Sequence, residues 1–194
     1  MHRYNAAKSI IREIHSGYIF TTDYWGPLRS HISFVLSHSG KAEDLDSVIN
    51  KISSDKKDNY LEKIEGIKKF WGKKRFTKIT LNKKVWKHKN IRINVTPEMS
   101  YAYKDKTYVI KLFFSSNDKS ISKNEADMLL EIMRDSLDVN PKEVNLGVLD
   151  VSRDKLFKYS NPSAELLYFV QAEAEELYKT LEKIEKTDNN SDPL

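Results

Sequence analysis

The sequence predicts an α+β protein, in which an N-terminal helical region precedes a mainly antiparallel sheet with the order β-β-β-α-β-β-α. Two patterns support this prediction. Hydrophobic residues recur at helical spacing up to Trp71, whereas β-branched and aromatic residues alternate with polar ones over residues 76–114. With 194 residues, 39% of them hydrophobic, the chain can bury a core without disulfides or a structural metal. Cysteine is absent, which excludes thiol chemistry and cysteine-based metal sites.

Four helices are expected in the first 73 residues. The second begins at Pro27, which suits a first helical position, and ends before Gly40. Alternation in the same stretch also fits a strand, so both interpretations stay open there. Asp55 is expected to cap the fourth helix and Gly72 to end it. In chain order, the apolar stretches of these helices are residues 4–14, 28–36, 45–52 and 60–71.

Strands are expected after Gly72. Residues 91–95, 99–103 and 108–114 alternate in polarity, and Pro97 separates the first of these stretches from the second. The polar sequence Lys104-Asp105-Lys106 can turn the chain, so the last two strands form a predicted hairpin.

The remaining elements are a helix, two strands and a last helix. Ser120 or Ser122 caps the first helix, which carries apolar residues over 126–137, and Asn140-Pro141 ends it. A buried strand follows at 144–151, a short partner strand at 156–159, and the last helix starts near Pro162. The predicted organisation is thus a helical region over 1–73 and an α+β domain over 74–194, which can also pack as one unit.

Positive charge is concentrated in one segment of the chain. Between Gly66 and Pro97 there is no Asp or Glu, and eleven Lys and Arg residues lie there. The net charge is +5, so the rest of the chain sums to −6. Such a segment attracts polyanions. Its basic residues are Lys68, Lys69, Lys73, Lys74, Arg75, Lys78, Lys83, Lys84, Lys87, Lys89 and Arg92.

Aromatic residues are interleaved with these cations. We expect the eleven basic residues to contact phosphates and Trp86 or Trp71 to stack on bases. Most of the basic residues are lysine, which favours phosphate contact over base recognition. Two alternatives stay open: the lysines solvate a sheet face, or they reflect a genome rich in A and T.

Three further residues suggest a different chemistry. Pro97-Glu98 precedes the predicted hairpin, Lys111 lies in its second strand, and Asp150 stands in the otherwise apolar strand that follows. A helix, a hairpin, a helix and a strand in this order resemble the core of the PD-(D/E)xK nucleases. The resemblance implies that acidic residues hold Mg²⁺ and that a lysine helps activate water, with Glu98, Lys111 and Asp150 as candidates. However, Val109 stands where that family has its second acid and cannot bind metal.

Asp150 has two interpretations. It is either a turn-forming residue at a strand end, paired with Arg153, or one half of an Asp–Lys pair with Lys111 in a cleft.

Other catalytic motifs are missing from the sequence. It contains no glycine-rich phosphate-binding loop and no Gly-x-Ser-x-Gly, and its five histidines are scattered without metal-ligand spacing. We therefore expect a cytoplasmic, non-enzymatic nucleic-acid-associated domain without cofactor. The alternatives are a protein-interaction module that docks a partner on its acidic last helix or a sheet edge, and a divergent Mg²⁺-dependent nuclease. No apolar run reaches the ~18 residues of a membrane helix, so no membrane partner is expected.

Overall fold

Helices cover both faces of a mixed five-stranded sheet. The computed structural model describes residues 23–81, 84–114, 120–137, 139–140, 142–160 and 164–189. Its helices are α2 (Gly26–His38), α3 (Lys57–Trp71), α4 (Lys123–Leu137) and α5 (Ala164–Asn189), with the 3₁₀ helices η2 (Ala42–Lys51) and η3 (Ser54–Lys56). Its strands are β1 (Thr77–Lys78), β2 (Lys84–His88), β3 (Ile91–Val95), β4 (Met99–Tyr103), β5 (Lys106–Phe113), β6 (Val144–Asp150) and β7 (Lys155–Lys158).

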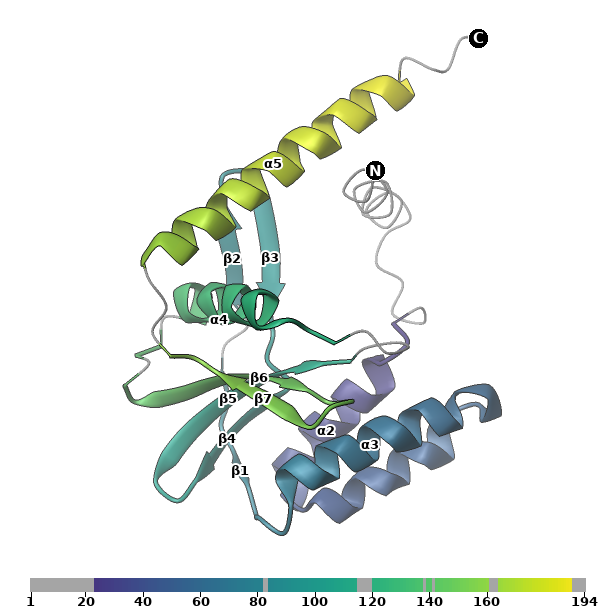
Figure 1. Ribbon diagram of the computed structural model, residues 1–194. Coiled ribbons are helices and arrows are strands. Elements are labelled where there is room, and N and C mark those ends of the chain that lie inside the picture. The colour runs from purple at the N-terminus through teal and green to yellow at the C-terminus, as the bar shows by residue number, and fades with distance from the viewer. Residues whose placement is uncertain are drawn as a thin grey trace.

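The elements form layers, as Figure 1 shows. Helices α2 and α3 lie on one side of the sheet and α4 lies on the other, with α5 and the β2–β3 hairpin beyond α4. This arrangement confirms the predicted mixture of helices and strands, with helices first. None of the described helices is long and apolar enough to cross a membrane.

The helical layer follows the predicted pattern with two differences. Residues 26–38 are helical, which decides against the strand interpretation of this stretch. The stretch expected as a third α-helix is instead the 3₁₀ helix η2. Helix α3 begins at Lys57 without a side-chain cap, so Asp55 does not cap it, and Gly72 ends it with a φ of +61°. The helix expected over 4–14 lies outside the described residues.

The sheet differs from the expected one in strand direction and order. Its order is β1-β4-β5-β6-β7, and β5 and β6 run parallel. The expectation of a mainly antiparallel sheet was therefore wrong. The parallel pair arises because α4 carries the chain across one face between β5 and β6. Strand β3, expected beside the other strands, pairs only with β2 in a separate two-stranded sheet, and β1 and β2 were not predicted.

The predicted β4–β5 hairpin is confirmed. Tyr103 pairs with Lys106 across a two-residue loop, in which Lys104 and Asp105 have φ values of +48° and +58°. Positive φ at both loop residues is the geometry of a type I′ turn, whose twist matches that of the paired strands.

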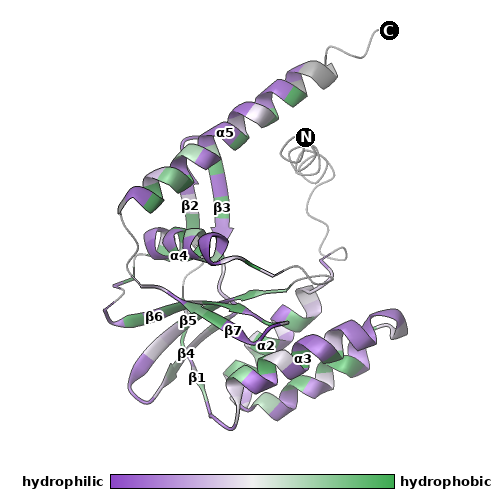
Figure 2. Ribbon diagram, viewed as in Figure 1, coloured by the Kyte–Doolittle hydropathy of each residue, from purple (hydrophilic) through white to green (hydrophobic). Residues whose placement is uncertain are grey.

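Two apolar cores lie on the two faces of the sheet. The first joins α2, η2 and α3 to the sheet, and the second joins α4 and α5 to its other face. Along the helices in Figure 2, hydrophobic and hydrophilic stretches alternate, as expected where only one helix face is buried. Helix α4 starts in a capping box, in which Ser122 Oγ accepts from the N–H of Glu125 and Glu125 Oε2 accepts from the N–H of Ser122.

Candidate functional site

The carboxylate of Glu98 is held between two strands and helix α2. Glu98 directly precedes β4, and Lys111 lies in the neighbouring strand β5. Lys111 Nζ donates to Glu98 Oε1 at 2.5 Å, and the N–H of Leu112 donates to Oε2 at 2.8 Å. Arg29 Nε lies 3.4 Å from Oε1. The Glu98 side chain is only 3% exposed, so its charge is compensated inside the protein.

Asp150 lies one strand further along the same face. Lys111 pairs with Val148 in the parallel β5–β6 ladder, and Asp150 follows Val148 by two residues, which places its side chain on the same side of the sheet. Asp150 is 1% exposed, and its Oδ2 accepts from the N–H of Ile121 at 3.4 Å. Its Oδ1 has no hydrogen-bond partner among the described residues. The structure thus places Glu98, Lys111 and Asp150 on adjacent strands, and Lys111 contacts Glu98.

This donor set does not fit a magnesium ion. Both oxygens of Glu98 already accept hydrogen bonds from the protein, and strand β5 separates this carboxylate from Asp150. Val109, at the position of the missing acid, is fully buried in the core under α4. Among the described residues, no group of three or more His, Asp or Glu side chains is placed to hold a metal. What the structure shows here is an ion pair between Lys111 and Glu98.

The predicted basic segment is divided between the two sides of the sheet. Its first half ends α3 and forms β1, beside the helical layer, whereas its second half forms the β2–β3 hairpin on the α4 side. The division arises because the chain leaves the sheet after Ile79 and packs Trp86 against α4. The hairpin carries Lys84, Lys87, Lys89 and Arg92, and Lys83 lies outside the described residues.

Several of these cations are already paired. Lys68 Nζ donates to Asp46 at 2.8 Å and to Glu65 at 3.0 Å, and these hydrogen bonds raise the pKa of Lys68. Lys69 lies 3.1 Å from Asp154. On the hairpin, Lys89 lies 2.7 Å from Glu175 of α5. Such pairs reduce the positive potential that a polyanion would meet.

A second set of cations gathers where α2 and α3 end. A depression of about 510 Å³ is lined by Lys41, Lys73, Lys74 and Arg75, together with Glu43 and Asp44. Gly40 lets the chain after α2 lie close to the chain after α3. Its φ is +62°, its carbonyl accepts a hydrogen bond from the N–H of Phe76, and a Cβ here would lie 2.3 Å from the Phe76 carbonyl oxygen. Lys78 follows on β1 and reaches α2. We call the five cations Lys41, Lys73, Lys74, Arg75 and Lys78 the α2–α3 basic surface.

The aromatic residues of the basic segment are buried. Trp71, Phe76 and Trp86 are 0%, 3% and 2% exposed, respectively. Trp71 Nε1 donates to the Lys74 carbonyl at 3.1 Å, and Trp86 Nε1 donates to Asp135 at 3.0 Å. No face of these rings is open to a base, which argues against the stacking expected for Trp86 or Trp71.

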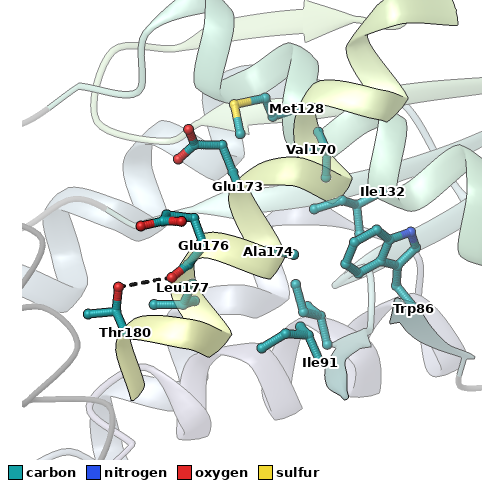
Figure 3. Close-up of a pocket in the computed structure, with 11 residues that line it drawn as sticks. Trp86, Ile91, Met128, Ile132, Val170, Glu173, Ala174, Glu176, Leu177 and Thr180 are labelled. Carbon is teal, nitrogen blue, oxygen red and sulfur yellow. Dashed lines mark hydrogen bonds between the residues drawn. The ribbon is translucent and has the colours of Figure 1, made fainter. Parts of the chain in front are cut away.

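An apolar groove lies between the hairpin, α4 and α5. Figure 3 shows side chains of all three elements directed toward this space of about 290 Å³, with Trp86 from β2 and Ile132 from α4 among them. Glu173 and Glu176 of α5 are the acidic residues of the lining. The sequence did not indicate this groove, because its walls come from stretches more than 30 residues apart.

No known protein family, curated protein or solved structure matches this chain.

Proposed function

We propose that this protein binds nucleic acid through the α2–α3 basic surface without catalysing a reaction. The observation that carries the proposal is that four cations from two segments line one depression, and that a fifth, Lys78, lies against α2, which ends beside that depression. Among the described residues, no acidic side chain forms an ion pair with Lys41, Lys73, Arg75 or Lys78. Glu43 and Asp44 also line the depression, but the cations outnumber them. Cations that lie close together attract phosphates and release condensed counterions on binding.

One of the five cations has a different role. Lys74 Nζ donates to the carbonyl of Phe70 at 3.0 Å, where α3 ends. A cation there stabilises the helix by satisfying a free carbonyl and opposing the negative end of the helix dipole. Lys78 Nζ also donates to the hydroxyls of Ser33 and Ser37 and to the Ser33 carbonyl, but this carbonyl lies within α2 and not at its end. We count four cations as available for phosphate contact: Lys41, Lys73, Arg75 and Lys78.

Fluorescence anisotropy with labelled single-stranded DNA, duplex DNA and RNA tests this function. The double variant K73Q/R75Q removes one lysine and one arginine from the basic surface. K87Q/R92Q removes the same residue types from the exposed face of the β2–β3 hairpin and is the matched control. We expect K73Q/R75Q to lose affinity for nucleic acid and the control to retain it. Equal behaviour of the two variants, or absence of binding by the wild type at low salt, contradicts the proposal.

Catalysis of nucleic-acid cleavage is not part of this proposal. Both oxygens of the Glu98 carboxylate accept hydrogen bonds from the protein, and Val109 replaces an acid that the nuclease mechanism needs. We expect Mg²⁺ to leave bound DNA and RNA intact on a denaturing gel. Cleavage that is lost in E98A would instead support the nuclease alternative.

The apolar groove supports a second candidate function, the docking of a protein partner. Its floor is formed by apolar side chains such as Trp86, Val170 and Ala174, and its acidic residues lie on α5. This chemistry fits a segment with apolar residues flanked by lysine or arginine. A leucine–lysine model helix should bind the protein and a leucine–glutamate helix should not, and A174R should abolish binding by filling the groove. Equal binding of both helices would rule out this candidate.

A further inference from the structure

Phe34 is an aromatic residue on the outer surface of α2. It is 54% exposed, although Ile32 and Val35, which lie on either side of it in the sequence, are buried on the inner face of the same helix. Its ring stacks on that of His38, with 4.0 Å between the ring centroids and 25° between the planes. The ring of His38 is held in turn, since its Nδ1 lies 2.9 Å from the Phe34 carbonyl. The ring of His31 also lies nearly parallel to that of Phe34, with 5.9 Å between the centroids. Phe34 thus lies in an ordered row of three rings, and its exposed half is the part open to a ligand.

A fixed positive charge is held on the same helix. Lys78 Nζ donates to Ser33 Oγ at 2.9 Å, to Ser37 Oγ at 2.8 Å and to the Ser33 carbonyl at 3.4 Å. These serines precede Phe34 and His38 by one residue each, so the ammonium group lies about 100° around the same helix from the two rings. All three acceptors are neutral, so these contacts order the lysine while its charge remains.

The same part of the molecule carries the basic surface described above. Lys78 belongs to that surface, and Gly40, two residues after α2 ends at His38, contacts Phe76 just before β1. Phe34 is therefore an exposed aromatic ring on the helix that Lys78 contacts and that ends at the α2–α3 basic surface. The aromatic residues inside the basic segment do not offer this combination, because Trp71, Phe76 and Trp86 are buried.

We propose that Phe34, supported by His38, is a stacking platform for a base of single-stranded nucleic acid, and that Lys78 contacts an adjacent phosphate. This inference rests on the proposed nucleic-acid binding by the basic surface and names its substrate class. An exposed ring beside a cationic track is the recognition pattern of single strands, whose bases present free faces. Bases inside a duplex are covered on both faces by their neighbours, so Phe34 has nothing to stack on there.

Anisotropy with a labelled oligothymidylate and with a duplex of equal phosphate number distinguishes base stacking on Phe34 from phosphate binding by the basic surface. F34A should weaken binding to the single strand by at least about fivefold, the lower end of what stacking on one base contributes. Duplex binding should change by less than about twofold, because the phosphate contacts remain. F34W should restore single-strand binding, and its fluorescence should be quenched when the oligothymidylate binds.

The matched control is F169A. Phe169 is 52% exposed, nearly the same as Phe34, but it lies on α5 beyond α4. We expect F169A to bind both probes like the wild type. If F34A binds the single strand as tightly as the wild type while K73Q/R75Q does not, the stacking platform is refuted and the basic surface stands. If the wild type binds neither probe at low salt, both proposals are refuted.

Discussion

The salt dependence of K73Q/R75Q is the most informative test of the basic surface. Lys73 and Arg75 are exposed, and among the described side chains they have no ion-pair partner. Their replacement by glutamine therefore removes two charges with little effect on packing. Because each phosphate contact releases counterions, the loss should appear in the salt slope and in the affinity itself.

The size of the salt slope follows from the number of cations that are available for phosphate contact. If Lys41, Lys73, Arg75 and Lys78 each contact one phosphate of a single strand, log K should fall against log salt with a slope of about −2.8, at about 0.7 per contact. Affinity then decreases about 50-fold between about 50 and 200 mM salt. With two contacts removed, the slope becomes about −1.4 and the decrease about sevenfold.

Anisotropy titrations at four or more salt concentrations give both slopes. The control K87Q/R92Q should keep the wild-type slope, because its cations lie on the hairpin on the other side of the sheet. A slope that is unchanged in K73Q/R75Q, or reduced equally in the control, would refute the assignment of phosphate contacts to the α2–α3 basic surface.

Three further predictions concern the scaffold. E98A should lower the free energy of unfolding in urea by about 3 kcal/mol, because Lys111 loses its buried partner, while nucleic-acid affinity stays unchanged; loss of binding in folded E98A would contradict the structural role. G40A should lower the free energy of unfolding by about 2 kcal/mol, because its φ is +62° and its Cβ would meet the Phe76 carbonyl; wild-type stability would show that the close approach is not needed. Lys89, and then His88, hold the pKa of Glu175 at about 2, below its ordinary value of 4.5. This depressed pKa stabilises the folded state above about pH 4.5, and the stabilisation is lost as pH falls toward 2, so E175Q should remove that part of the pH dependence of the unfolding midpoint. An identical pH profile in E175Q would contradict this role of the ion pair.

Local patterns predicted the elements whose signals lie within a few residues. Helix α3 combines an apolar face with Gly72 at its end, and α4 carries its own capping box at Ser122. The β4–β5 hairpin was evident from alternation, although Lys104 and Asp105 are unusual residues for its turn. The parallel pairing joins β5 to β6, which α4 separates in the chain. No pattern within a few residues indicates such a pairing.

The candidate site was predicted only in part, for the same reason. The sequence correctly indicated that positive charge is concentrated in residues 68–92. In the structure the two halves of this segment lie on different sides of the sheet, because Trp86 belongs to the core on the α4 side. Lys41 joins the basic surface from outside the predicted segment, through the approach of Gly40 to Phe76. Phe34 alternates with apolar neighbours in the sequence, and only the helical geometry of α2 places it at the surface.

The position of the β2–β3 hairpin in the chain makes it a separable module. Strands β1 and β4 are direct antiparallel neighbours: Lys78 pairs with Tyr101, and the N–H of Ile79 donates to the Ser100 carbonyl. The hairpin between them is therefore an insertion whose two ends meet at one rung of the sheet. A short loop in its place would keep every pairing of the five strands and would uncover the apolar side of α4. The groove is thus built by an insertion. Its replacement would leave the register of the five strands unchanged but would remove Trp86 and Val95 from the core on the α4 side.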